Sequence, residues 1–163
     1  MTPVARIERE LPFRGALMQR DGHAPIGFGN LARMFSHATL GTNDLARAVA
    51  FYDALLAELS LWRHEYSEDY GFAGYATAPE ATPQFFITRP FDGRHATVGN
   101  GVTIAFEAKD RAAVDRFHAT ALAQGGTDEG APGLRPHYHA DYYGAYLRDP
   151  DGNKLCCVCH GPE

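Results

Sequence analysis

The sequence states one pattern twice, and this repeat restricts the fold more than any other feature. Segment 35–56 reads FSHATLGTNDLARAVAFYDALL, and segment 102–122, found by adding 66 to the numbering, reads VTIAFEAKDRAAVDRFHATAL. In both copies a short apolar run meets an aspartate, Asp44 or Asp110, and an amphipathic stretch follows. An aspartate there can accept a hydrogen bond from an unpaired backbone N–H at a helix start. The repeat therefore predicts two copies of a strand–helix unit.

The segments after each predicted helix, which spans 43–59 or 110–124, indicate further strands. Short runs of strand-forming residues occupy 61–66, 70–77 and 84–88 in the first half, and 127–130, 142–148 and 153–159 in the second. Residues 131–140 are predicted as a loop, and Asp-Pro-Asp-Gly at 149–152 suits a tight turn. Each half thus reads β-α-β-β-β. The predicted fold class is α+β, with two βαβββ modules in each of which one helix covers one face of a four-stranded sheet and the other face stays open.

Strand alternation assigns the second copy's residues to two faces. Its apolar residues share one parity and are predicted to lie under the helix: Val102, Ile104 and Phe106. Thr103 then faces the open side, and by the repeat so does His37. Cys156 is expected on the same side, whereas Cys157 and Cys159 take the parity of the core.

Composition limits the classes of function. A chain of 163 residues with 45% hydrophobic and 21% charged residues fits one globular domain. A net charge of −5 argues against nucleic acid or an anionic membrane as a partner. Three clustered cysteines and no secretory signal favour the cytoplasm. Residues 1–33 lack a clear period, and we interpret them as an extension or arm, or as an over-extended start.

The layout resembles the vicinal oxygen chelate superfamily, which includes glyoxalase I, bleomycin-resistance proteins and extradiol dioxygenases. The resemblance rests on His37 in the first strand, the helix DLARAVAFYDALL and the closing hairpin YLRDPDGNKLCCV. It implies a domain at 34–160 with modules at about 35–88 and 101–160. It also implies that the two modules form a cupped mixed sheet with the helices on its convex side, and that the open face holds a cleft, in many members with one divalent metal.

The resemblance places metal ligands on the first and last strands of each module, and this chain departs from that pattern. His37 matches, but Thr103 stands where a histidine is usual and Cys156 where a glutamate is usual. The fourth position falls near Phe86, with Gln84 as a polar neighbour. Two protein ligands are fewer than zinc sites use. We therefore expect either no cofactor or, less in keeping with the ligand count, a divalent metal on His37 with Cys156.

Other readings stay open for the candidate residues. His37 and Cys156 are candidate catalytic groups. The alternatives are that His37 is an inherited histidine that only hydrogen-bonds to a neighbour, and that Cys156, like most strand cysteines, packs as a small hydrophobic residue. Thr103 and Phe86 are candidate substrate-binding residues on the open face. The loop before the last hairpin adds three more candidates, although such a loop can also be plain surface: His137, His139 and Tyr143. If extended, its two histidines would share a face. Four further aromatic residues could either form an aromatic pocket or belong to the ordinary core: Trp62, Tyr75, Phe86 and Tyr146.

Three functions remain compatible with the sequence. The first is a small-molecule cleft protein without the usual metal centre. The second is a metal-dependent lyase, isomerase or dioxygenase with a rearranged site, and the third is an interaction module with a vestigial pocket. The resemblance also implies a homodimer.

Overall fold

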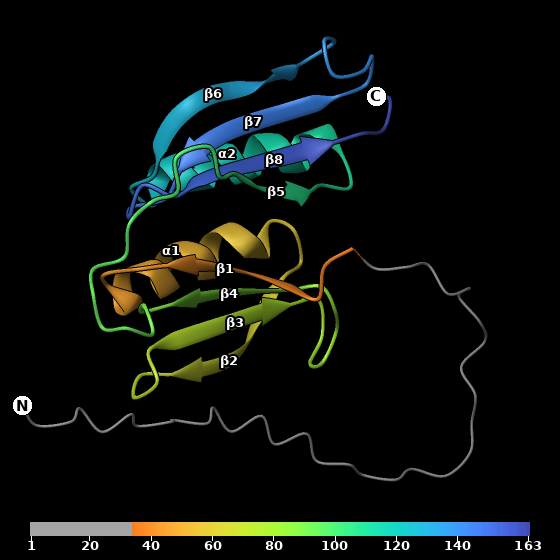
Figure 1. Cartoon of the computed structure of the whole chain (residues 1–163). Coiled ribbons are helices and arrows are strands. Elements are labelled where there is room, and N and C mark those ends of the chain that lie inside the picture. Colours follow the sequence, from red (N-terminus) through yellow and green to blue (C-terminus); the bar gives the residue numbers. More distant parts are fainter. Residues whose placement is uncertain (1–33) are drawn as a thin grey trace, which may run out of the picture. The chain divides into compact units, whose positions relative to one another are not determined.

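The computed structural model describes residues 34–163, which belong to one compact unit, and the predicted arm at 1–33 lies outside them. The elements in chain order are β1 His37–Gly41, α1 Leu45–Ala57, β2 Trp62–Ser67, β3 Phe72–Ala76, β4 Gln84–Thr88, β5 Ile104–Glu107, α2 Arg111–Ala123, β6 Thr127–Leu134, β7 Tyr143–Arg148 and β8 Lys154–Cys159 (Figure 1). No helix of this described part is long and apolar enough to cross a membrane.

Hydrogen bonding groups these strands into two four-stranded sheets. The strand order is β1-β4-β3-β2 in one sheet and β5-β8-β7-β6 in the other. In each sheet the module's first strand runs parallel to its last, β1 to β4 and β5 to β8, and the remaining neighbours are antiparallel. The α+β fold of two βαβββ modules is therefore confirmed, with the backbone pairing kept within each module.

Both helices begin at the aspartates that the repeat predicts. Asp44 Oδ1 accepts a hydrogen bond from the backbone N–H of Arg47 at 3.0 Å. Asp110 Oδ1 accepts one from Ala113 at 2.7 Å. Both capping residues have extended backbone angles, as a helix N-cap requires. The same local chemistry therefore starts the helix of each module.

One hydrophobic core extends through both modules, on the helix side of the sheets. The ring of Phe85 on β4 lies 5.2 Å from that of Phe106 on β5, and Phe106 lies 5.9 Å from Phe117 on α2. Ile104 packs against this core and Cys157 is part of it. The predicted parity is thus correct for Ile104, Phe106 and Cys157, and the opposite side of each sheet is the open face. Val102, predicted to lie under the helix as well, precedes β5 and is 50% exposed, so that expectation is wrong.

The turn between β7 and β8 joins the modules through buried polar contacts. The hydroxyl of Tyr52 on α1 donates to Asp149 Oδ2 at 2.7 Å. The Asn153 side chain donates to the backbone oxygen of Gly41 at 3.0 Å and to Asp149 Oδ2 at 2.9 Å. Asp151 accepts the Thr42 hydroxyl at 2.6 Å. This segment therefore closes the hairpin and also holds β1 and α1 against the second module.

The second module differs from expectation in one strand. Residues 131–134, predicted as loop, continue β6 to Leu134, which pairs with Tyr143 on β7. Pro132 argues against a strand in the sequence, because proline has no backbone N–H to donate. Proline is tolerated in β6 because β6 is an edge strand, where the missing N–H faces no partner. The register shifts twice along β6, which accommodates the irregular segment.

Candidate functional site

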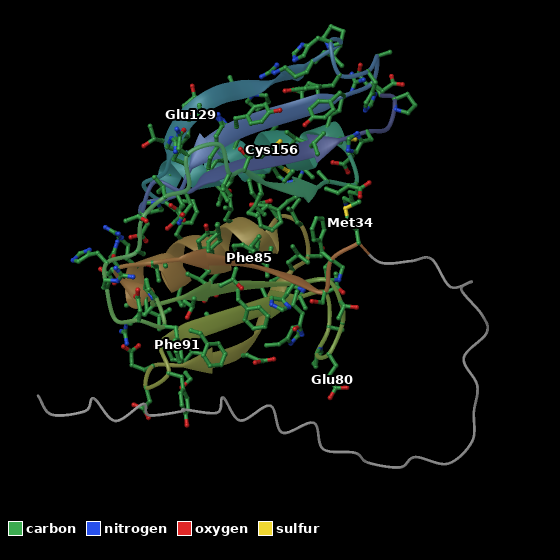
Figure 2. All side chains as sticks on the ribbon, in the orientation of Figure 1. Met34, Glu80, Phe85, Phe91, Glu129 and Cys156 are labelled. Carbon is green, nitrogen blue, oxygen red and sulfur yellow. The ribbon has the colours of Figure 1, made fainter. Side chains whose placement is uncertain are left out.

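Cys156 lies on the open face of the second module. In β8 it pairs with Ala105 on β5 and with Tyr146 on β7, so these three side chains share one side of the sheet. Its neighbours Leu155 and Cys157 belong to the core instead. Cys156 is nevertheless only 1% exposed, because aromatic side chains cover it. Figure 2 labels its position on β8.

Tyr142, Tyr146 and Cys156 form a connected group, which we call the tyrosine–cysteine cluster. The Tyr142 hydroxyl lies 3.3 Å from the Tyr146 hydroxyl and 3.7 Å from Cys156 Sγ. Burial raises the pKa of the Cys156 thiol, although the hydrogen bond from Tyr142 opposes this. Burial also raises the pKa values of Tyr142 and Tyr146. At neutral pH the cluster is therefore uncharged, and it offers hydrogen bonds rather than a thiolate nucleophile.

Charged groups lie at one end of this cluster. The Lys154 ammonium lies 5.5 Å from the ring centre of Tyr146 and 3.2 Å from Glu129 Oε2. Arg148 Nε donates to the other oxygen of Glu129 at 2.6 Å. Hydrogen bonds from Arg148 and then Lys154 lower the pKa of Glu129. Two cations and one carboxylate leave this group with a net charge of one positive unit.

A histidine pair lies on another side of Tyr142. His139 Nε2 and His160 Nδ1 are 2.8 Å apart, and their rings stack with centres 5.1 Å apart. The His160 ring meets that of Tyr142 edge to face at 5.3 Å. His160 was not predicted, and nothing in the sequence marks it, because its partner lies 21 residues earlier.

The loop around His137 and His139 is not extended, so the condition under which the two histidines would share a face is not met. Residues 136–138 form a turn in which the backbone N–H of Tyr138 donates to the oxygen of Arg135. His137 packs on Tyr138 with ring centres 4.3 Å apart and is exposed. The turn therefore sends the two histidines to different partners.

Tyr143, predicted to bind substrate, has the opposite orientation from the cluster. Its hydroxyl donates to Asp115 on α2 at 2.8 Å, and the Arg111 guanidinium lies 5.3 Å from its ring centre. Tyr142, one residue earlier, is the tyrosine that lies on the open face beside Tyr146 and Cys156. The signal was present in the sequence, because Tyr142 and Tyr146 share a parity and Tyr143 does not.

The first module's open face carries His37 and Phe86. Their rings meet edge to face at 5.9 Å, and His37 Nδ1 also lies 2.9 Å from the Ser36 hydroxyl. Phe86 covers Gly74, where an added Cβ would approach the ring to 2.6 Å. Thr103 is exposed just before β5. Of the other proposed pocket aromatics, Tyr75 is buried in the core and Trp62 is exposed on β2.

A pocket of about 200 Å³ lies where the linker before β5 meets β1 and β8. The residues that line it are Thr39, Leu40, Gly41, Thr97, Gly99, Val102, Asn153 and Lys154. Lys154 is the one charged residue among them. The pocket and the tyrosine–cysteine cluster thus meet at Lys154.

The side chains at the superfamily's ligand positions do not fit its divalent metal. Phe86 has no donor atom, a neutral threonine hydroxyl is a weak ligand, and burial keeps the Cys156 thiol protonated. Gln84 and Thr88 share the parity of Phe86 and add only neutral oxygens. Within residues 34–163, no group of three or more His, Cys, Asp or Glu side chains could hold a metal ion.

Two βαβββ modules with strand order 1-4-3-2 in the first sheet and the equivalent order in the second, each with one open face away from its helix, define a protein of the vicinal oxygen chelate fold. The family model described as Glyoxalase/Bleomycin resistance protein/Dioxygenase superfamily matches residues 34–157, and the chain belongs to this superfamily.

Solved structures agree with this assignment. A glyoxalase/bleomycin resistance protein from Albidiferax ferrireducens is 42% identical, with a TM-score of 0.70 over 79% of this chain and 100% of that one. Two more distant structures share the fold alone. Lactoylglutathione lyase from Agrobacterium tumefaciens is 20% identical with a TM-score of 0.58, over 80% of this chain and 96% of that one. TioX from Micromonospora is 16% identical with a TM-score of 0.55, over 78% and 98%. No curated protein sequence matches the chain.

Proposed function

We propose that this protein binds a small organic molecule on the open face of its second module, and that it does so without the superfamily's usual metal centre. The observation that carries the proposal is that residues with weak or no metal-binding groups stand at the superfamily's metal-ligand positions. Thr103, Phe86 and Cys156 replace strong donors, while Tyr142 and Tyr146 join Cys156 in a hydrogen-bonded cluster. Such a face can bind a ligand through the phenol groups that cover the Cys156 thiol.

The chemistry of this cluster favours binding and orientation over nucleophilic attack. A thiol with a raised pKa is a poor nucleophile at neutral pH. Phenol hydroxyls donate and accept hydrogen bonds, and their rings offer apolar contact area to a ligand.

Restoring the lost ligands tests the metal part of the proposal. The double variant Thr103→His and Cys156→Glu should gain affinity for divalent metal, because it adds an imidazole and a carboxylate to His37. Isothermal titration with zinc, nickel and manganese on both proteins is the measurement. The natural chain should bind none of them stoichiometrically. Submicromolar binding by the natural chain, abolished by His37→Ala, would contradict the proposal.

The His139–His160 pair favours one competing function, a metal-dependent enzyme with a rearranged site. Both imidazoles lie beside Tyr142, which contacts Cys156. The same titration separates the alternatives, since a rearranged centre would lose its metal in His160→Ala but not in His37→Ala. The third possibility, an interaction module with a vestigial pocket, predicts that no small organic ligand binds the open face.

A further inference from the structure

We propose that Lys154 recognises the carboxylate of a small monoanionic organic acid, with the rest of the molecule lying along the open face towards the tyrosine–cysteine cluster. This inference rests on the proposed function and specifies its ligand class. It assigns a binding role to Lys154, Thr39 and Thr97, which belong to neither the core nor the superfamily's ligand positions.

The pocket supplies the chemistry for an anion. Lys154 is the single charged residue among those that line it, and Thr39 and Thr97 add hydroxyl groups that can donate hydrogen bonds. No carboxylate of the described residues lines the pocket. The Asn153 side chain is already engaged, since it donates to Gly41 and Asp149. An anionic group entering here would therefore meet hydroxyl donors and no carboxylate among the lining residues, with Glu129 as the one carboxylate already paired with the Lys154 ammonium.

Lys154 is placed to connect the pocket with the cluster. It lies two residues before Cys156 on β8, so both side chains project from the same face. Its ammonium lies 5.5 Å from the centre of the Tyr146 ring, whose hydroxyl reaches Tyr142. Ala105, the partner of Cys156 on β5, is small and exposed, which leaves that side of the cysteine uncrowded. A carboxylate on Lys154 would thus direct the organic part of the ligand over Tyr146.

The local charge balance favours a monoanion over a dianion. Glu129 uses one oxygen for Arg148 and the other for Lys154, so the three groups together carry one positive charge. Arg148 is further occupied by the backbone oxygen of Gly152 at 2.8 Å. An ammonium has three donors, of which Glu129 takes one. A carboxylate fits the remaining charge and donors, whereas a phosphate dianion would be left half neutralised.

The sequence contains only two lysines, Lys109 and Lys154, and this makes the test unusually direct. Lys109 is 80% exposed beside the start of α2 and serves as the internal control. Reductive ¹³C-methylation keeps the positive charge of both lysines. Each lysine then gives its own NMR signal, separate from that of the methylated amino terminus. We would titrate the full-length protein with benzoate, phenylacetate, benzyl alcohol and phenyl phosphate.

Benzoate or phenylacetate should shift the Lys154 signal saturably and leave the Lys109 signal in place. Benzyl alcohol, which keeps the ring and lacks the carboxylate, should not shift it. Lys154→Met should weaken binding of the acid on the order of tenfold or more, because a hydrogen bond to a charged group is lost, and Lys109→Met should not. Amide spectra of the unmethylated variants report both binding and an intact fold.

Three results would overturn the inference. They are equal shifts of both lysines, unchanged acid binding by a folded Lys154→Met variant, and no shift of Lys154 by either acid up to its solubility limit. Tighter binding of phenyl phosphate than of benzoate would overturn the assignment to a monoanion. If benzyl alcohol shifts Tyr142 and Tyr146 while Lys154 stays silent, the ligand class is wrong and the proposed function survives. Stoichiometric metal binding would instead contradict only the metal-free part of the proposed function and would leave the carboxylate assignment to Lys154 in place.

Discussion

Cys156 and Cys157 are neighbours on β8 that face opposite sides, and burial affects both thiols. Cys156 lies under Tyr142 on the open face, and Cys157 lies in the core. Burial raises the pKa of Cys157 to about 12, and the other two cysteines add to the rise. An unfolded thiol titrates at about 8.5. The folded protein therefore holds these protons more tightly than the unfolded chain does.

This difference predicts a loss of stability in alkali. A raised folded pKa contributes stability that is fully present below the unfolded pKa and disappears as the pH rises through the folded value. For Cys157 the window runs from about 8.5 to about 12. By pH 10 the loss from this thiol should be about 2 kcal/mol of unfolding free energy. Urea unfolding at pH 8 and pH 10 measures it, and Cys157→Ala should show a smaller difference between the two values. An equal difference in both proteins would show that Cys157 does not titrate in this way.

At the scale of the elements, the turn 149–153 is more than a hairpin connection. Tyr52 on α1 donates to Asp149, and Asn153 bonds to the end of β1, so a helix and a strand of the first module meet a turn of the second. All these groups are buried or nearly so. Burial first, and then the charge of Asp149, raise the pKa of Tyr52 well above its ordinary value. The hydroxyl thus acts as a fixed donor.

Tyr52→Phe tests this contact between elements. The change removes the donor and leaves a buried Asp149 oxygen with one partner fewer, so unfolding free energy should fall by about 1–3 kcal/mol. Tyr66→Phe is the matched control, because Tyr66 also bonds to a carboxylate, that of Glu68, but on the exposed surface. Its effect should stay within about 0.5 kcal/mol. Chemical denaturation of the two variants makes the comparison. Equal losses of unfolding free energy would mean that the buried contact stabilises the protein no more than the exposed one.

At the scale of the whole molecule, one core joins the two modules. Phe85 and Phe106 meet across them, and the helices α1 and α2 contact each other. Glu58 on α1 also accepts hydrogen bonds from Arg116 and Thr120 on α2. The modules of the described unit are therefore expected to unfold together in one transition.

The homodimer inferred by resemblance belongs to this scale and stays a prediction. The full-length chain should sediment as a dimer at micromolar concentration, and a version without residues 1–33 should associate more weakly or melt at a lower temperature. Analytical ultracentrifugation of both versions is the measurement. A monomer at that concentration in the full-length protein would rule out the dimer.

Much of the fold could be predicted from the sequence because it depends on local rules. The repeat located both modules, Asp44 and Asp110 marked both helix starts, and the two-residue period of strands assigned Ile104 and Cys157 to the core. The same period brings Cys156 to the open face, where its partner is Tyr146. These features need only neighbouring residues, so the sequence determines them by itself.

The composition of the candidate site was decided by tertiary structure. The backbone turn at 136–138 sends His139 to His160 rather than to His137, and no local pattern encodes that choice. The pocket beside Lys154 exists because the linker before β5 meets β1 and β8 there, and these segments lie far apart in the chain. Strand alternation assigns a side chain to a face, but which side chains meet there depends on how loops close over it. The sequence therefore determined the scaffold and the loss of the usual ligands, and only the folded chain determined what took their place.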